Sequence, residues 1–181
     1  MDVSATFTVT VTDDNGEEPY VEYDPYTPVT VTWPRYSRAL EPPISLGLSG
    51  AGGYLEVKFD AADRRLAGFV LVSAVVDTRN LPLPVPAFDE GSSSSTARLA
   101  AGERLRRALS GDLPLTQIAY DDALEIRIAD QPPLSVFPGP TVGFGSLGNG
   151  ELGAIYLKYS AEQRAFLLEN SGTGSSVGSR S

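Results

Sequence analysis

Alternation of apolar and polar residues runs through most of this sequence and constrains its fold more than any other feature. In the segment 6–12, TFTVTVT, an apolar residue stands at every second position between threonines. Successive side chains of a β-strand point to opposite faces, so this period is typical of a half-buried strand. Comparable apolar runs predict further strands over 28–33, 44–48, 54–59, 123–129, 141–146, 153–160 and 164–169. The chain is therefore predicted to be mainly β.

The segment 66–76, LAGFVLVSAVV, differs because it is apolar on both faces, which predicts a central strand. A strand that is buried on both sides needs a covering layer. One helix is predicted for this purpose near 96–110, because Ser95 or Thr96 can cap its start and Gly111 can end it. We therefore expect a mainly β (α+β) fold, with a twisted, largely antiparallel sheet or sheets and one packed helix near 96–110.

The chain of 181 residues suits one well-buried domain, which we predict over 1–170. The glycine- and serine-rich end, 171–181, has the composition of a disordered tail. Alternating prolines at the start of 81–95, LPLPVPAFDEGSSSS, predict an extended segment that leads into a flexible loop. The segments 50–64 and 150–164 share five identities in fifteen positions, which leaves open whether the fold consists of two related halves.

The residue types that are missing exclude several kinds of function. The chain contains no cysteine and no histidine, so it has no disulfide, no thiolate nucleophile and no zinc site with sulfur or nitrogen ligands. The commonest general base is also missing, and we expect neither a metal nor a cofactor. The formal net charge of −9 argues against a nucleic-acid partner. Because the start lacks the features of a signal peptide and no apolar run reaches the ~18 residues of a membrane helix, we expect a cytoplasmic protein without a membrane partner.

Two glycine-containing motifs have alternative interpretations. The segment 143–153, GFGSLGNGELG, contains the pattern GxGxxG twice, but the run that follows predicts a strand where a dinucleotide site needs a helix. We interpret this segment as a hairpin loop. The segment 13–18, DDNGEE, is similar to a calcium loop, yet counting back from Gly16 places Val11 at the first ligand position. The pair Asn15-Gly16 predicts a hairpin turn instead.

Paired carboxylates are a route to catalysis that does not require histidine. Two carboxyl groups that flank a glycosidic bond are sufficient for hydrolysis when their separation is suitable. The candidate residues are Asp121, Asp122 and Glu125, together with the pair Glu22 and Asp24. Their separations depend on the fold, so this enzymatic alternative stays open.

The stretch 13–28, DDNGEEPYVEYDPYTP, is the main candidate for a binding site. It carries six carboxylates and three tyrosines, and no basic residue precedes Arg35. Tyrosines are enriched in protein interfaces, and carboxylates steer a cationic partner. If 20–24 is extended, Tyr20, Glu22 and Asp24 share one face and Tyr23 lies on the other. We predict a protein partner with a basic surface that is bound by Tyr20, Glu22, Tyr23, Asp24 and Tyr26. The alternative is a solvated loop whose tyrosines cover the edge of the core.

The hairpin 54–73, YLEVKFDAADRRLAGFVLVS, resembles a unit found in small bacterial proteins associated with polymorphic toxin systems. Some of those proteins are immunity proteins, which are typically cytoplasmic, non-enzymatic and often acidic. The resemblance implies a non-catalytic protein-binding module, such as an immunity protein that neutralises a toxin, and it assigns no residues. A carboxylate-based enzyme acting on a sugar or other small molecule, and a structural subunit of a larger assembly, are the alternatives.

Overall fold

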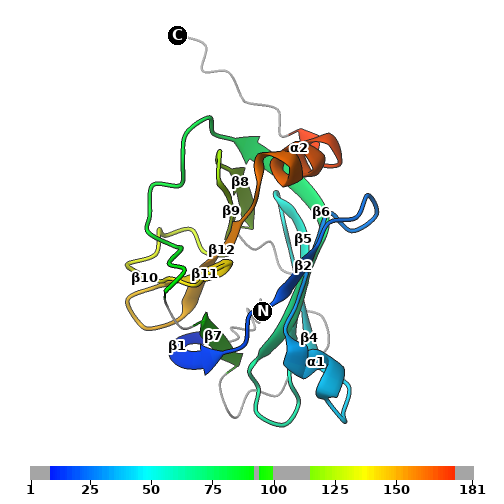
Figure 1. Cartoon of the computed structure of the whole chain (residues 1–181), viewed down its shortest axis with the longest axis vertical. Coiled ribbons are helices and arrows are strands. Elements are labelled where there is room, and N and C mark those ends of the chain that lie inside the picture. Colours follow the sequence, from blue (N-terminus) through cyan, green and yellow to red (C-terminus); the bar gives the residue numbers. More distant parts are fainter. Residues whose placement is uncertain (1–8, 92–93, 100–114, 174–181) are drawn as a thin grey trace, which may run out of the picture.

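The computed structural model describes residues 9–91, 94–99 and 115–173, and over these ranges the protein is mainly β (Figure 1). Two helices are present in the described ranges, α1 (Pro34–Arg38) and α2 (Ala161–Glu169). The strands are β1 (Val9–Gly16), β2 (Tyr20–Glu22), β3 (Val29–Thr32), β4 (Ile44–Gly50), β5 (Gly53–Phe59), β6 (Leu66–Thr78), β7 (Ser94–Leu99), β8 (Thr116–Ala119), β9 (Ala123–Arg127), β10 (Ser135–Phe137), β11 (Val142–Ser146), β12 (Leu152–Lys158) and β13 (Gly172–Thr173). The predicted fold class is confirmed.

The long strand β6 joins two walls of one curled sheet. Its first part pairs antiparallel with β5 and β3, and its last part pairs parallel with β8 and β13. One wall has the order β4-β5-β6-β3-β2, and the other continues from β6 through β8, β9, β12, β11 and β10 (Figure 1). Every other pairing is antiparallel, so the sheet is mixed but largely antiparallel, as predicted.

Strands β1 and β7 form a separate antiparallel ribbon that connects the two walls at one end. On the β1 side, Thr10 forms a bridge with Glu151 in the turn between β11 and β12. On the β7 side, the Leu99 amide donates to the carbonyl oxygen of Arg64 in the turn between β5 and β6, at 3.0 Å. Helix α2 lies at the opposite end of the molecule (Figure 1).

The core lies between the two walls and is built on large aromatic side chains. Trp33 follows β3 and packs against Phe69 of β6 and Phe144 of β11, with ring centroids 6.3 and 6.4 Å apart. All three side chains are buried. Alternation explains this arrangement, since the residues of β3 that point inward are Val29 and Val31. Full burial of each large apolar side chain contributes about 1.5–3 kcal/mol, so these contacts hold the walls together.

Two predictions differ from the structure in the residues that it describes. The start of the helix predicted near 96–110 is strand β7, which pairs with β1, while 100–111 lies outside the described residues. In β7, Ala97 and Leu99 are buried and Arg98 between them is exposed, which is the alternation of a strand. Conversely, the strand predicted over 164–169 belongs to helix α2.

The expectations of a hairpin at Asn15-Gly16 and of two related halves are not supported by the strand pairing. Strand β1 continues through Gly16, which is opposite Ser94 of β7 after a register shift. The loops near Gly50 and Gly150 both turn a hairpin, which confirms the hairpin interpretation of 143–153. Beyond these hairpins the halves diverge, because β5 leads into strand β6 whereas β12 leads into helix α2.

The central strand β6 is buried on both faces over only part of its length. From Leu66 to Phe69 every residue is buried, as predicted for 66–76, and Leu71 is buried as well, whereas Val70 on the outer face is only half-buried. Val72 and Val75 are about 40% and 37% exposed, which corrects the expectation for the second half. Beyond Leu71, the strand therefore has one solvated face.

The proline-rich segment 81–88 is a strap that covers the outer surface of the second wall, and it bends at Leu81 and at Pro84 and Val85 where an extended segment was predicted. The strap is anchored at both ends, since the Leu83 amide donates to Oδ1 of Asp122 at 2.7 Å and Phe88 forms a bridge with Gly139. Its Ala87 packs with Tyr156 in a second buried apolar cluster. A side chain at Gly143 would place Cβ 2.4 Å from the Ala87 carbonyl oxygen, so this close approach requires glycine.

Regular structure continues past the domain end expected at residue 170. Gly172 and Thr173 pair with Val75 and Val76 of β6, so the predicted tail 171–181 begins with a short strand. Its remainder, 174–181, lies outside the described residues. None of the described helices is long and apolar enough to cross a membrane.

Candidate functional site

Strand β2 places the predicted binding residues on two different sides of the first wall. It pairs only with β3, so it is the edge strand. Val21 packs against the core, which directs Tyr20 and Glu22 to the outer face of the sheet. Tyr20 is 69% exposed. The strand alternation expected for 20–24 is therefore present.

Strand pairing brings Tyr20 and Glu22 together with residues that are distant in sequence. One row across the wall runs from Glu22 through Thr30 and Val70 to Glu56, and a parallel row runs from Tyr20 through Thr32 and Gly68 to Lys58. Three strand spacings separate the ends of each row, which corresponds to about 14 Å. We call this surface the open face, defined by Tyr20, Glu22, Thr30, Thr32, Tyr54, Glu56, Lys58, Val70 and Val72.

Aromatic and apolar side chains at several points of the open face are available for contact. Besides Tyr20, the exposed large hydrophobic residues include Tyr54 and Val72. Near the middle of the wall, Lys58 lies over the ring of Tyr36, with Nζ 5.6 Å from the ring centroid. Large exposed apolar groups on a sheet surface with a polar rim are typical of protein interaction sites.

The loop after β2 carries further exposed groups. Tyr26 is 89% exposed, and its amide donates to Oδ1 of Asp24 at 2.8 Å. This hydrogen bond holds the turn that presents both side chains. Within the described chain, Glu22 and Asp24 form no ion pair. Their negative charge is therefore available to an incoming partner.

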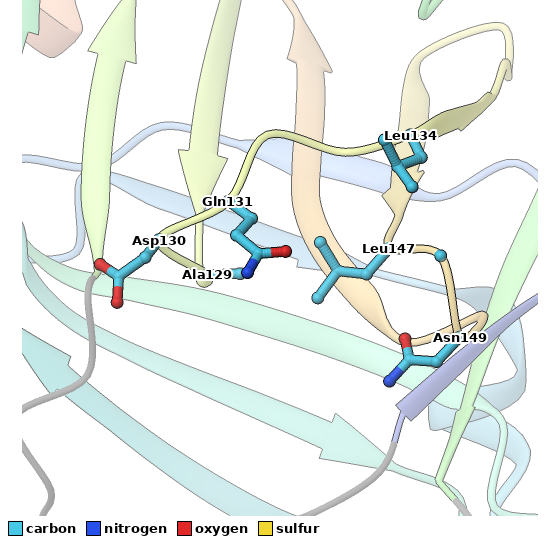
Figure 2. A pocket seen from close by; sticks show the side chains of 7 residues that line it. Ala129, Asp130, Gln131, Leu134, Leu147 and Asn149 are labelled. Carbon is cyan, nitrogen blue, oxygen red and sulfur yellow. The ribbon is translucent and has the colours of Figure 1, made fainter.

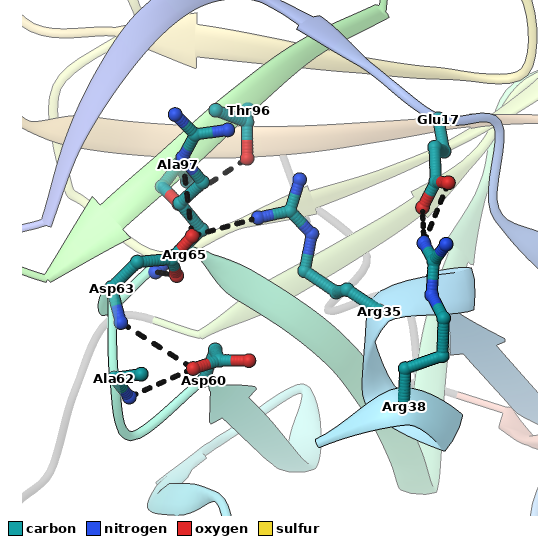
Figure 3. Close-up of polar contacts among 9 residues, drawn as sticks. All are labelled: Glu17, Arg35, Arg38, Asp60, Ala62, Asp63, Arg65, Thr96 and Ala97. Carbon is teal, nitrogen blue, oxygen red and sulfur yellow. Dashed lines mark hydrogen bonds and ion pairs between the residues drawn. The ribbon is translucent and has the colours of Figure 1, made fainter. Parts of the chain in front are cut away.

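One carboxylate of the acidic stretch is neutralised within the protein. Glu17 accepts hydrogen bonds on both oxygens from Arg38 of α1, as Figure 3 shows. At the start of α1, Arg35 pairs with Asp63 at 3.4 Å. No basic residue precedes Arg35 in the sequence, but in the folded protein Arg38 neutralises Glu17 of the acidic stretch.

Tyr23 does not belong to the open face. Its ring packs edge-to-face against Phe166 of α2, with centroids 6.4 Å apart. Burial raises the pKa of the Tyr23 hydroxyl well above its usual value. The hydroxyl oxygen is buried and has no hydrogen-bond partner among the described residues. The structure thus leaves Tyr20, Glu22, Asp24 and Tyr26 exposed, and it turns Tyr23 inward.

Tyr54, Glu56 and Lys58 were missed as neighbours of Tyr20 by sequence reasoning. Alternation in 54–59 already places Glu56 and Lys58 on a polar face of their strand. The sequence does not reveal the strand order. Strands β5 and β2 share a surface because β6 and β3 lie between them in the sheet.

Of the carboxylates considered for catalysis, Asp121, Asp122 and Glu125 are occupied by structural contacts, whereas Glu22 and Asp24 are exposed. Glu125 is buried, and its Oε1 accepts from Nε and Nη2 of Arg127 at 3.1 and 2.9 Å. Its Oε2 accepts from the Tyr120 hydroxyl at 3.1 Å. Asp122 holds the strap at Leu83, and Asp121 pairs with Arg164 at 3.6 Å.

A pocket of about 530 Å³ lies between the loop after β9 and the turn between β11 and β12 (Figure 2). Gln131 and Leu147 point toward each other across it, and Leu134 and Asn149 lie at its sides. Its lining includes a single carboxylate, that of Asp130. This lining therefore does not contain the pair of carboxylates that glycoside hydrolysis uses. Over the described ranges, no group of three or more acidic side chains is placed to hold a metal ion.

Compared with models of known protein families the chain matches none, and a search of curated proteins likewise finds no match. The functional assignment therefore depends on the geometry of the site.

Proposed function

We propose that this protein is a non-catalytic cytoplasmic protein-binding module whose open face and adjoining loop bind a partner with a basic surface, as an immunity protein binds and neutralises a toxin. The observation that carries this proposal is the exposure of Tyr20 and Tyr26 beside Glu22 and Asp24, two carboxylates without an ion-pair partner in the described chain.

The partner contacts the face of the sheet and not its edge. Strand β2 has only three residues and follows directly on Pro19, which has no amide proton to offer to an added strand. Short edges next to proline discourage pairing with another chain. The outer side chains of β2, β3, β6 and β5 instead form a continuous surface.

Charged and aromatic residues act on different steps of binding. Exposed carboxylates attract a basic partner over a distance of about a Debye length, so they raise the association rate and make it sensitive to salt. Tyrosines bury contact area once the complex has formed, so they lower the dissociation rate. Glu22 and Asp24 belong to the first group, and Tyr20 and Tyr26 belong to the second.

The test begins with affinity capture from the native host, followed by surface plasmon resonance on the captured partner. The charge variant carries Glu22→Gln and Asp24→Asn, and the aromatic variant carries Tyr20→Ala and Tyr26→Ala. We expect slower and less salt-sensitive association in the first variant and at least about tenfold faster dissociation in the second.

A control variant with the same loss of charge carries Asp130→Asn and Glu162→Gln, two exposed residues on other elements. It should leave the binding kinetics unchanged. The proposal would be refuted if the open-face variants and the control variant bound the partner identically while all of them remained folded.

A further inference from the structure

Strand β4 is the edge of the first wall on the side away from β2. It pairs with β5 along all seven of its residues, and no other described strand pairs with it. The edge strands β2 and β10 have only three residues each. A strand edge presents amide and carbonyl groups to which another strand can bind, and a longer edge presents more of them.

The direction of these backbone groups follows from the strand register, starting at β3. The Trp33 amide donates to the Ala67 carbonyl oxygen at 2.9 Å, so the odd-numbered residues in the first part of β6 turn their backbone groups toward β3. Successive residues of a strand turn these groups to opposite sides. Val70 therefore turns its amide and carbonyl groups toward Glu56 of β5, which lies opposite it.

The same alternation determines the direction of the groups in β4. The next residue of β5, Val57, turns toward β4, where it lies opposite Leu46. Ser45, Gly47 and Ser49 therefore turn their amide and carbonyl groups away from the sheet. Within the described ranges, no strand pairs with that side of β4.

The edge itself is uncharged. The sequence of β4, ISLGLSG, contains no ionisable side chain and no proline, the two devices that commonly prevent an edge from pairing. The nearest charged side chains of the wall, Glu56 and Lys58, belong to β5. If two β4 strands pair, these side chains stay at least three strand spacings, about 14 Å, from their counterparts. A second copy of the chain therefore meets no opposing charge along this edge.

We propose that β4 is a homodimer interface, in which two copies pair antiparallel about a two-fold axis at Gly47. Ser45 then lies opposite Ser49 of the second copy, and each outward-facing pair exchanges two backbone hydrogen bonds. On the inner face, Leu46 lies beside Leu48 of the second copy. The axis is perpendicular to the sheet, so the two open faces lie on the same side of one continuous sheet. The dimer does not depend on the proposed binding of a basic partner.

Sedimentation equilibrium of the full chain measures this association. We expect a reversible monomer–dimer equilibrium in the micromolar range, since a single pair of strands is a small interface. A two-fold contact closes on itself, so no species larger than the dimer should form.

Two charge variants at the same positions test the register. Ser45→Lys with Ser49→Lys places like charges opposite each other twice, whereas Ser45→Lys with Ser49→Glu places opposite charges there. We expect the first variant to associate at least about tenfold more weakly than the second. General repulsion between copies predicts the reverse order, because the chain is negative and the first variant reduces its net charge.

A proline variant tests the backbone contribution. Ser49→Pro removes an amide that turns outward in the monomer, so this variant should stay folded and should fail to dimerise. Circular dichroism and urea denaturation show whether each variant is folded.

The proposal is overturned if the wild type stays monomeric at high concentration or forms larger oligomers. It is also overturned if the two folded charge variants associate equally, or if Ser49→Pro dimerises as the wild type does, since the copies would then meet on another surface.

Discussion

Removing Arg127 should destabilise the protein strongly, because Glu125 would be left as a buried carboxylate without its cation. The Glu125 side chain is 4% exposed and that of Arg127 is 30% exposed. Two hydrogen bonds from Arg127 reach Oε1, and the Tyr120 hydroxyl reaches Oε2. Burial, together with the Glu125 carboxylate, raises the pKa of Tyr120, so this hydroxyl keeps the proton that it donates.

The magnitude follows from what Arg127→Leu leaves behind. Breaking a buried ion pair by removing one partner costs about 3–5 kcal/mol. Partial exposure of Arg127 means that water screens the pair and can reach part of the vacated space, so we expect roughly 2–4 kcal/mol. For a chain of this length, about 1 kcal/mol lowers the melting temperature by roughly 2–4 °C, so Tm should fall on the order of 10 °C.

Urea denaturation followed by circular dichroism measures the free energy of unfolding. The matched control is Arg79→Leu, which removes an exposed partner of Asp77 and should cost less than about 1 kcal/mol. The double variant Glu125→Gln with Arg127→Leu should recover part of the stability, because its buried amide carries no charge. Equal losses in Arg127→Leu and Arg79→Leu would refute the argument, as would a double variant no more stable than Arg127→Leu.

Three further outcomes can be measured on the same samples. Burial raises the pKa of Tyr156 from 10.0 to about 12. The neutral hydroxyl's contribution to stability is therefore complete below pH 10 and is lost as the pH rises through about 12. The free energy of unfolding should fall less steeply with pH over this range in Tyr156→Phe than in the wild type. Gly143→Ala should cost about 1–3 kcal/mol by pushing the strap away, whereas Gly91→Ala, with its nearest neighbour atom at 3.5 Å, should be close to neutral. Leu71→Asp should abolish folding because Leu71 is fully buried. Val72 is partly exposed, so Val72→Asp should remain soluble and unfold cooperatively. A folded Leu71→Asp beside an unfolded Val72→Asp would show that the faces of β6 are wrongly assigned.

The strands could be predicted from the sequence because alternation is a local signal. The predictions for 28–33, 44–48, 54–59 and 123–129 each coincide with an observed strand. Proline marks a boundary in the same local way, since Pro34 ends the strand pattern and is the first residue of α1. Such features depend only on the conformational preferences of neighbouring residues.

Helix α2 was missed although the sequence carries its start signal. Ser160 and Gln163 form the capping box, a serine followed three residues later by glutamine, which marks a helix N-terminus. The apolar residues 166–168 that follow were interpreted as a strand, because a short apolar run has no clear period. In contrast, the capping residues near 95–96 belong to β7, where pairing with β1 outweighs a weak local preference.

The surface shared by Tyr20 and Lys58 could not be predicted, because it depends on the order of strands that are far apart in the chain. Alternation determines which residues of a strand share a face, but it does not determine which strand lies next to it. Strand β2 shows both sides of this limit. Its alternation separates Tyr20 and Glu22 on the open face from Val21, which packs against the core. Tyr20→Ala should therefore weaken protein binding without lowering the free energy of unfolding, whereas Val21→Asp should lower the free energy of unfolding.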